Sequence, residues 1–296
     1  MYCLEGISKR FDEVEALTAL DLEINDGEWL GIVGRNGSGK TTLLRMLVGL
    51  SSPTTGRVLF NGTEPSAEDW RAIRHSLGFM PERIAFFENL TGDRMLRYFA
   101  RLKGVVEAEV SPLLERVGLG NAAKRKLGGY SKGMLQRLNF AQALLGNPRL
   151  LIVDEPIEGL DVQGVREFFE ILKSDQNRTV VISSHRLSLF SRYMDRVCVL
   201  SNGSVKAIGT EDDLHKKLQL PVRVVLHPEV ASNGEVVKAL QALGSASIVS
   251  QNGRVIVKVS QRHKVQFLAD LAKLDAIVQD VRIEEPSLEE VLLETS

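Results

Sequence analysis

Eight consecutive residues near the N-terminus have the types and spacing needed to bind a polyphosphate. The stretch from Gly34 to Thr41 fits the phosphate-loop pattern G-x-x-x-x-G-K-[ST] at every position. Its glycines let successive backbone N–H groups turn inward, and a helix that starts at the end of the loop adds partial positive charge. Lys40 would then reach the β- and γ-phosphates, while the Thr41 hydroxyl would ligate Mg²⁺. We expect the nucleotide contacts of the loop to come from Gly34, Asn36, Gly37, Ser38, Gly39, Lys40, Thr41 and Thr42.

The segments on either side of this loop decide whether the pattern is meaningful. The apolar run Trp29–Val33 before the loop predicts a buried strand. After it, Leu43, Leu44 and Leu47 recur at helical spacing. A glycine-rich turn with a surface lysine is the alternative interpretation, and it leaves this order of strand, loop and helix unexplained. The sequence therefore predicts a nucleotide-binding loop.

Two acids and a histidine follow later apolar runs. Asp154 and Glu155 end one such run, and His185 lies just past the run 179–183. Since the carboxyl ends of parallel strands meet at the ligand edge of a sheet, we expect these side chains near the Mg²⁺ bound at the loop. A single histidine is more often solvated than functional, but this one shares an edge with a phosphate loop and two acids. We therefore interpret all three as site residues.

Ser131 and Phe11 each have a structural and a functional interpretation. Ser131 precedes a helix marked by Met134, Leu138 and Leu145, so it is a sound N-cap. Phe11 lies ahead of the phosphate loop, where an aromatic ring is equally suited to packing and to stacking on adenine. The residues alone leave both choices open.

The composition excludes several classes of protein. With 37 Lys and Arg against 38 Asp and Glu, the net charge of -1 gives no basic excess to hold nucleic acid. Cys3 and Cys198 lack metal-ligand spacing, which disfavours a zinc site and a disulfide scaffold. No apolar run approaches the ~18 residues of a membrane span, and we find no signal peptide. We expect a cytosolic protein that reaches any membrane through a partner.

Together, these motifs resemble those of the ATP-binding-cassette (ABC) ATPases over residues 1 to about 215. The resemblance implies binding of ATP with Mg²⁺, and ATP hydrolysis. It also implies an α/β fold, with a P-loop (RecA-like) ABC ATPase core, an antiparallel β subdomain and an inserted helical subdomain at about 85–145. Residues 1–218 would form this ATPase domain.

The same resemblance implies roles for individual residues. The catalytic residues would be Lys40, Glu155 as the base and His185 as the γ-phosphate switch. The Mg²⁺ ligands would be Thr41, Glu82 and Asp154. Beyond the loop, the nucleotide contacts would be Phe11 stacked on adenine, the signature residues Ser131 and Gly133, and Asp161 in a loop that communicates across a dimer.

Three places depart from the family pattern. Glu82 stands where many members have glutamine. Lys132 and Met134 replace glycine and glutamine in the signature, and Ile157 replaces a common threonine. None of these changes removes a catalytic group, so we expect an active ATPase. Such forms are similar to those of the exporter-like (ABC-2 type) branch.

Within that branch, residues 79–104, 132–145 and the tail 285–290 most resemble the ATPase subunits of transporters for copper-site maturation of nitrous oxide reductase (NosF). The resemblance implies a homodimer that sandwiches two ATP molecules and sits on the inner face of the cell membrane. Its partners would be integral membrane permease subunits and, through them, a periplasmic maturation protein. The permease contact is expected in the segment 81–101, where Phe86 and Phe87 lie in a loop.

Other functions remain as alternatives. One is the ATPase of another ABC-2 exporter, for a drug, lipid or polysaccharide. A soluble ABC ATPase acting on ribosomes or DNA would usually carry two cassettes, a long coiled coil or a basic surface. A P-loop kinase or GTPase would need an acceptor lid or a guanine-reading motif. Neither set of features is visible in the sequence.

Residues 219–296 form a predicted second domain with the element order β-α-β-β-α-β of a ferredoxin-like unit. We predict strands at 222–226, 246–250, 255–260 and 276–283, and helices at 235–243 and 263–274. A last helix would begin at its cap, Ser287. The histidines of this region are scattered, which disfavours metal binding. A dimer-supporting or regulatory domain is the expected role.

Overall fold

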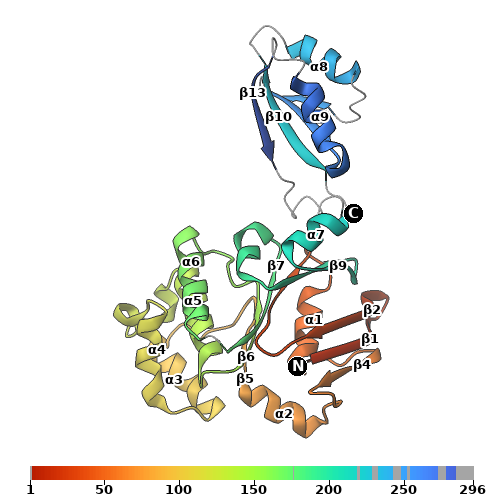
Figure 1. Ribbon diagram of the computed structural model, residues 1–296. Coiled ribbons are helices and arrows are strands. Elements are labelled where there is room, and N and C mark those ends of the chain that lie inside the picture. The colour runs from red at the N-terminus through yellow and green to blue at the C-terminus, as the bar shows by residue number, and fades with distance from the viewer. Residues whose placement is uncertain are drawn as a thin grey trace. The chain divides into compact units, whose positions relative to one another are not determined.

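In the computed structural model, a six-stranded sheet forms the centre of the N-terminal part of the chain (Figure 1). The strand order is β5-β6-β7-β3-β8-β9. Neighbours are parallel except β8 and β9, which pair antiparallel around a turn at Asn202 and Gly203. Parallel strands are covered on both faces, which explains why the runs before Asp154 and His185 are largely apolar. The bounds are β3 (Trp29–Val33), β5 (Leu77–Met80), β6 (Leu150–Asp154), β7 (Thr179–Ser184), β8 (Arg196–Ser201) and β9 (Ser204–Gly209).

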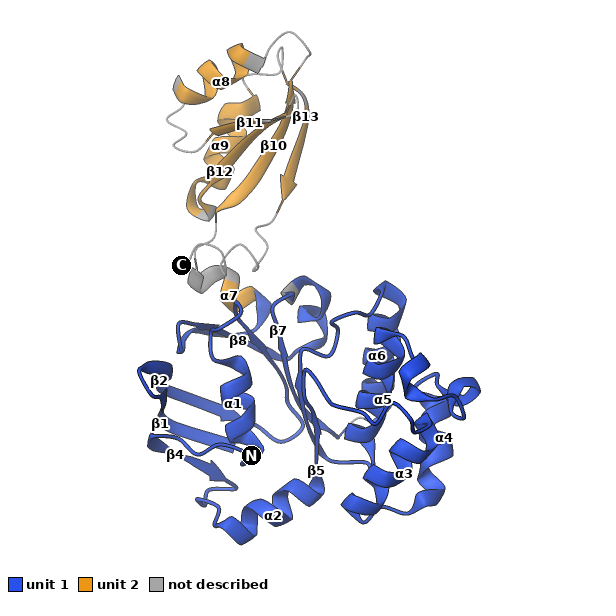
Figure 2. Cartoon of the chain, turned by 180° about the vertical axis from the view of Figure 1, so that it is seen from behind, with its two compact units in different colours: residues 1–211, 296 blue, residues 212–295 orange. Residues whose placement is uncertain are grey.

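The structure describes residues 2–175, 177–218, 221–228, 233–242, 248–251, 254–272 and 278–284. The chain divides into two compact units, one of residues 1–211 with 296 and one of residues 212–295 (Figure 2). The division after residue 218 stays a prediction of the sequence. Among the helices of the described ranges, none combines the length and the apolar composition of a membrane span.

A second, antiparallel sheet with the order β2-β1-β4 packs over the phosphate-loop helix. Its strands are β1 (Tyr2–Phe11), β2 (Val14–Ile24) and β4 (Thr55–Phe60), and the helix is α1 (Lys40–Leu47). Leu20, Leu22 and Ile24 are buried and alternate with exposed acids, as the sequence pattern predicts. These leucines share one core with α1 and with Ile152 of the central sheet. The antiparallel sheet therefore holds α1 against one face of the parallel sheet.

Helices α5 (Lys132–Leu144) and α6 (Val162–Lys173) cover the opposite face (Figure 1). Phe140 of α5 and Phe168 of α6 pack with ring centroids 4.3 Å apart. Phe169 stacks on Tyr193 at 4.0 Å. The helices α1 and α5 therefore begin on different sides of the sheet. The first unit also contains α2 (Ala67–Ser76) and the 3-10 turns η4 (Leu187–Leu189) and η5 (Ser191–Tyr193). Helix α7 (Glu211–Leu218) lies at the start of the second unit.

The expected helical insertion is present between β5 and β6. It contains α3 (Gly92–Lys103), η1 (Glu107–Glu109), α4 (Val110–Arg116), η2 (Gly120–Ala122), η3 (Leu127–Gly129) and α5. The Thr91 hydroxyl caps α3 by accepting the Arg94 N–H at 3.3 Å. Gly104 ends the same helix in the left-handed conformation, with φ 69°. This local chemistry sets both ends of α3.

The second unit has the ferredoxin-like order of elements, as predicted, around its own core (Figure 2). Its antiparallel sheet runs β11-β12-β10-β13, and Val224, Leu226 and Val257 pack beneath α8 and α9. The helix predicted from 263 begins one residue later, after a 3-10 turn. The predicted helix at Ser287 and the tail 285–290 lie outside the described residues. The bounds are β10 (Val222–Pro228), α8 (Asn233–Ala242), β11 (Ile248–Gln251), β12 (Arg254–Val259), η6 (Gln261–His263), α9 (Lys264–Leu271) and β13 (Val278–Glu284).

Candidate active site

The loop from Gly34 to Gly39 joins β3 to α1 at the carboxyl edge of the parallel sheet (Figure 1). Gly37 and Gly39 have φ values of 83° and 105°, in the region that side chains disfavour. A Cβ atom at Gly34 would lie 2.3 Å from the Ser38 hydroxyl, so this position has no room for a side chain. No side chain caps α1, which leaves the backbone N–H groups of its first turn available to an anion.

Neighbouring segments brace the loop from behind. The N–H of Gly203, in the turn between β8 and β9, donates to the Ser38 carbonyl at 3.1 Å. The Gly203 carbonyl accepts the N–H of Thr18 in β2 at 2.9 Å. A Cβ atom at Gly39 would lie 2.6 Å from the carbonyl oxygen of Ala16. Strand β2 and this turn therefore fix the shape of the loop.

Lys40 is buried beneath the loop. Its Nζ donates to the carbonyls of Gly34 and Arg35, at 2.8 and 3.3 Å, and lies 3.4 Å from Glu155 Oε1. The hydroxyl of Ser38 is buried and has no hydrogen-bond partner. A buried hydroxyl without a partner is costly, so it indicates a ligand-facing position. The ammonium, the hydroxyl and the free N–H groups of α1 fit a polyphosphate.

Glu155 has a backbone conformation that non-glycine residues rarely adopt, with φ 47°. Its N–H is held by Ser183, through the hydroxyl at 3.1 Å and the carbonyl at 3.2 Å. The same hydroxyl donates to Asp154 Oδ1 at 2.5 Å. Ser183 is a site residue that the sequence reasoning missed. The signal for it was the polar end of an otherwise apolar strand, just before His185.

The Glu155 carboxylate is held from one side only. His185 contacts Oε2 twice, through its backbone N–H at 3.3 Å and its ring Nδ1 at 3.0 Å. Oε1 is buried, accepts no hydrogen bond and faces Lys40. A carboxylate with one oxygen held in place and the other free of hydrogen bonds can position a water molecule and accept its proton. The structure therefore brings Lys40, Glu155 and His185 together, and links Asp154 to them through Ser183.

The expected metal ligands are only partly gathered. Thr41 lies half-buried in the first turn of α1, followed by Thr42, while Asp154 is buried at the end of β6. Glu82 is paired with Arg83 at 3.4 Å, and no contact joins it to Asp154 or Thr41 in the described structure. No three His, Cys, Asp or Glu side chains in the described ranges form a metal cluster. A Mg²⁺ ion here would depend on phosphate oxygens for most of its ligands.

The remaining predicted residues lie near the surface. Phe11 is 48% exposed at the end of β1, with the Lys9 ammonium 5.0 Å from its ring centroid. Ser131 caps α5 by accepting the Met134 N–H at 3.2 Å. Asp161 caps α6 in the same way. Gly133 packs against the loop that precedes α6. These caps give Ser131 and Asp161 a structural role in addition to any role in binding.

Comparison with known proteins identifies the family. A protein-family model described as ABC transporter matches residues 17–158. The uncharacterized ABC transporter ATP-binding protein YdbJ of Bacillus subtilis (strain 168) is 31% identical over 99% of this chain and 94% of its own length. The chain belongs to the ABC transporter ATP-binding proteins. As an ABC cassette, it binds and hydrolyses ATP.

This ABC ATPase is also similar to the bacitracin transport ATP-binding protein BcrA of Enterococcus faecalis. The identity is 36% over 72% of this chain and 70% of BcrA. Among solved structures, the dimeric structure of MJ0796, a bacterial ABC transporter cassette, superposes with a TM-score of 0.65 at 26% identity. That match covers 71% of this chain and 98% of MJ0796. The architecture of the ABC cassette core, predicted from the motifs, is confirmed.

Proposed function

We propose that this ABC ATPase is the motor subunit of a membrane exporter and hydrolyses ATP at sites shared between two copies of the chain. The observation that carries the chemistry is the Glu155 carboxylate, with its open oxygen 3.4 Å from the Lys40 ammonium on the phosphate loop. The bacitracin transport function in the name of BcrA supports export. The chain would lie on the cytoplasmic face of the cell membrane, held there by its permease.

The residues at the sheet edge would each have a different role in ATP hydrolysis. The backbone of the loop and Lys40 would bind the phosphates, and Phe11 would stack on the base. Thr41 and Asp154 would hold Mg²⁺, with Glu82 near the same edge, and the ion would neutralise charge on the phosphate oxygens. Glu155 would orient the attacking water and take its proton through Oε1. His185 fixes the carboxylate for that step by holding Oε2.

The first turn of α5 would act on the nucleotide of the other copy. Since α1 and α5 cover opposite faces of the sheet (Figure 1), we assign the N-terminus of α5 to the nucleotide of the other copy and not to its own phosphate loop. Ser131 and Gly133 there would offer donors to a γ-phosphate held by the partner, and Asp161 would lie at the same boundary. The dimeric structure of MJ0796 supports this arrangement. ATP would then join two copies, and hydrolysis would let them part.

Ser131→Arg tests the shared site. We expect this variant to lose ATP hydrolysis, because the larger side chain blocks the partner's phosphate. Calorimetry on the isolated monomer should give a nucleotide affinity within about twofold of wild type, a change of roughly 0.4 kcal/mol. Thr91→Arg is the matched control, since it removes the equivalent cap from α3 and should keep hydrolysis. A Ser131→Arg monomer that no longer binds nucleotide would place Ser131 in its own site and refute the sandwich.

A cluster of aromatic side chains at the start of the helical insertion supports a membrane partner. Phe87 is 59% exposed and Phe86 is half-buried. Their rings contact Tyr98 and Phe99 of α3 edge to face, at 6.2 and 6.4 Å. Exposed aromatic groups of this kind mark interaction surfaces. We assign this aromatic cluster to the permease.

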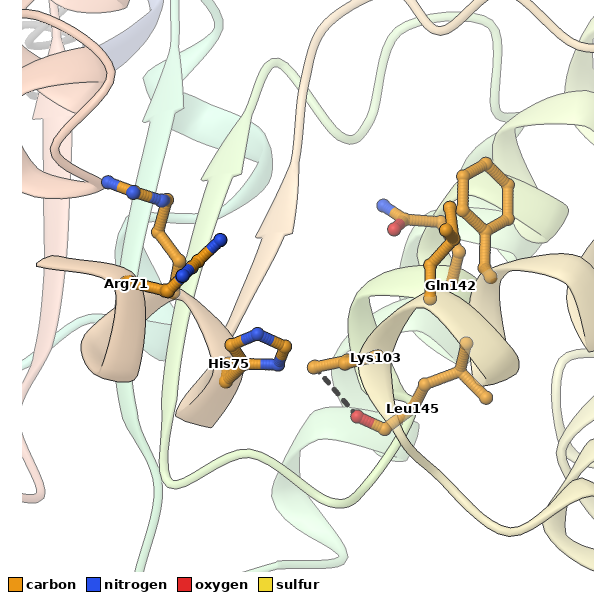
Figure 3. Close-up of a pocket in the computed structure, with 8 residues that line it drawn as sticks. Arg71, His75, Lys103, Gln142 and Leu145 are labelled. Atoms are coloured by element: carbon orange, nitrogen blue, oxygen red, sulfur yellow. Dashed lines mark hydrogen bonds between the residues drawn. The ribbon is translucent and has the colours of Figure 1, made fainter. Parts of the chain in front are cut away.

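A pocket of about 350 Å³ between α2, α3 and the end of α5 continues from the aromatic cluster (Figure 3). Lys103 donates to the Leu145 carbonyl at 2.8 Å, and burial lowers the pKa of this lysine to about 8. It therefore still carries its charge at pH 7. None of the described residues that line the pocket is acidic, and its basic and apolar walls suit an acidic side chain on an apolar segment of the permease. It is lined by Arg71, Arg74, His75, Phe99, Leu102, Lys103, Gln142 and Leu145.

Two kinds of cargo are candidates for this exporter. The name of BcrA gives bacitracin as the compound transported, and the likeness to it favours a drug as the cargo. Copper-site maturation of nitrous oxide reductase is the second candidate, favoured by the resemblance of residues 79–104 and 132–145 to NosF subunits. On that candidate a periplasmic maturation protein would receive copper through the permease. In both cases the permease selects the cargo.

Phe87→Asp tests the docking surface. The variant should keep the ATPase activity of the purified chain, because the ring is remote from the phosphate loop, but should lose co-purification with the permease and transport. Val265→Asp, an equally drastic change at an exposed position of α9, should retain both. Full transport with Phe86 and Phe87 both changed to aspartate would show that the aromatic cluster is not the permease contact. Stoichiometric copper on the purified chain, measured by elemental analysis, would show that cargo is held here and not by the permease.

A further inference from the structure

We propose that Lys132 and Glu158 form a latch that couples the two ATP sites of the dimer. This proposal rests on the shared site proposed above. Lys132 is the residue that replaces glycine in the signature, and the hydrolysis scheme gives it no role. Its Nζ lies 2.6 Å from Glu158 Oε1, in the loop that connects Glu155 to α6. The latch therefore joins the first turn of α5 to the loop that carries the catalytic base.

The aliphatic stem of Lys132 lies directly on this loop. Gly159 has φ 81°, and a Cβ atom there would lie 2.9 Å from Lys132 Cδ. A side chain at Gly159 would therefore displace the lysine. Gly133 approaches the same segment, since its Cβ position is 3.6 Å from the Gly159 carbonyl oxygen. Two glycines thus give the close approach that the ion pair needs.

A second contact supports the latch one turn further along α5. Gln136 Nε2 donates to the Pro156 carbonyl at 3.0 Å and lies 3.4 Å from the Glu155 carbonyl. At its other end the loop is fixed by Asp161, whose side chain accepts the Gly164 N–H at 2.8 Å. A shift of the backbone at Glu155 therefore moves the first turn of α5. That turn carries the donors proposed for the partner's nucleotide.

Charged groups from two other loops surround Glu158. Lys132, Arg83 and His185 all favour its ionised form and lower the pKa of the carboxyl group. Arg83 follows β5, and His185 holds the catalytic carboxylate. Movement of either residue changes the field at Glu158. The ion pair is partly exposed, with 67% and 44% of the two side chains accessible. Its loss therefore changes the equilibrium between the joined and separated states of α5 and the loop by no more than about fivefold. A weak contact of this size suits a reversible latch.

A charge swap tests the latch in the purified, full-length ATPase. We expect Lys132→Glu and Glu158→Lys each to lower kcat about three- to fivefold and to bring the Hill coefficient for ATP close to one. The double variant should regain most of both, because the pair is restored with its signs exchanged. Lys132→Arg should behave as wild type. Nucleotide affinity of the monomer and its melting temperature should stay unchanged in every variant.

The matched control is the Arg166–Glu170 pair of α6, which has a similar distance and exposure. Its swap should leave kcat and the Hill coefficient unchanged. Single variants with wild-type kinetics would reduce the latch to a solvated ion pair and overturn the proposal. So would a double variant that stays as slow as Lys132→Glu, since Lys132 would then act on the phosphate directly. If Ser131→Arg refutes the shared site while the swap still restores kcat, the contact positions α5 within one chain, and coupling between sites is excluded.

Discussion

The Glu155→Gln variant will bind ATP with nearly wild-type affinity and hydrolyse it about 10²–10⁴-fold more slowly, the usual contribution of a general base. Glutamine can keep an acceptor toward His185, so the surroundings of the site are retained. It cannot take a proton from water. Because ATP remains intact, two chains should stay joined, and size-exclusion chromatography with ATP and Mg²⁺ should show a stable dimer.

The control for this experiment is Glu170→Gln, which changes an exposed glutamate of α6 and should have wild-type kcat. Turnover of Glu155→Gln within a few-fold of wild type would show that another group accepts the proton. A variant that fails to bind ATP at all would contradict the assignment in a different way. It would mean that the Lys40–Glu155 contact is needed to shape the loop.

The second large effect is the loss of folding stability that we expect when Arg178 is replaced. Arg178 is only 1% exposed, and its guanidinium donates to the Pro148 carbonyl at 2.9 Å, to Asn147 and to Asp175. It ties the start of β6 to the turn before β7. Arg178→Met should lower the free energy of unfolding by about 3–5 kcal/mol, because it leaves a buried carbonyl and the Asp175 carboxylate without their partner. For a unit of this size the melting temperature should fall by roughly 10 °C.

Differential scanning calorimetry measures this change directly. Arg166→Met, at a 66% exposed side chain paired with Glu170, should shift the melting temperature by no more than a degree or two. A loss at Arg178 no larger than at Arg166 would show that water replaces the guanidinium. Binding of ATP should be retained by the folded fraction of both variants, since both positions lie away from the phosphate loop.

Local sequence patterns were sufficient for the edge where the site is built. Trp29–Val33 is a strand and α1 starts at Lys40, because an apolar run, a glycine-rich turn and a helical repeat each depend on near neighbours. Asp154 and His185 could be placed at one edge because parallel strands must align their carboxyl ends. The cap at Ser131 follows the same local logic. These features needed no knowledge of distant contacts.

The contacts that tune the site could not be predicted in this way. Ser183 bridges Asp154 and Glu155 only because β6 and β7 are neighbours, an order that no local pattern specifies. Glu158 meets Lys132 across 26 residues of sequence. Glu82 was assigned from a motif position, but its partner in the structure is its neighbour Arg83. Such pairings depend on loop conformation, which is the least local property of a chain.

The bracing of the phosphate loop by Gly203 and the carbonyl of Ala16 has a consequence for which nucleotides compete for the site. Ordering one backbone residue costs roughly 1–2 kcal/mol. Contacts within the protein hold this loop, so part of that cost falls on folding and not on nucleotide binding. The backbone N–H groups of such a loop meet phosphates that ATP and ADP share, so ADP should compete with ATP for the site. We therefore expect ATP hydrolysis by the purified chain to slow as the share of ADP in the solution rises.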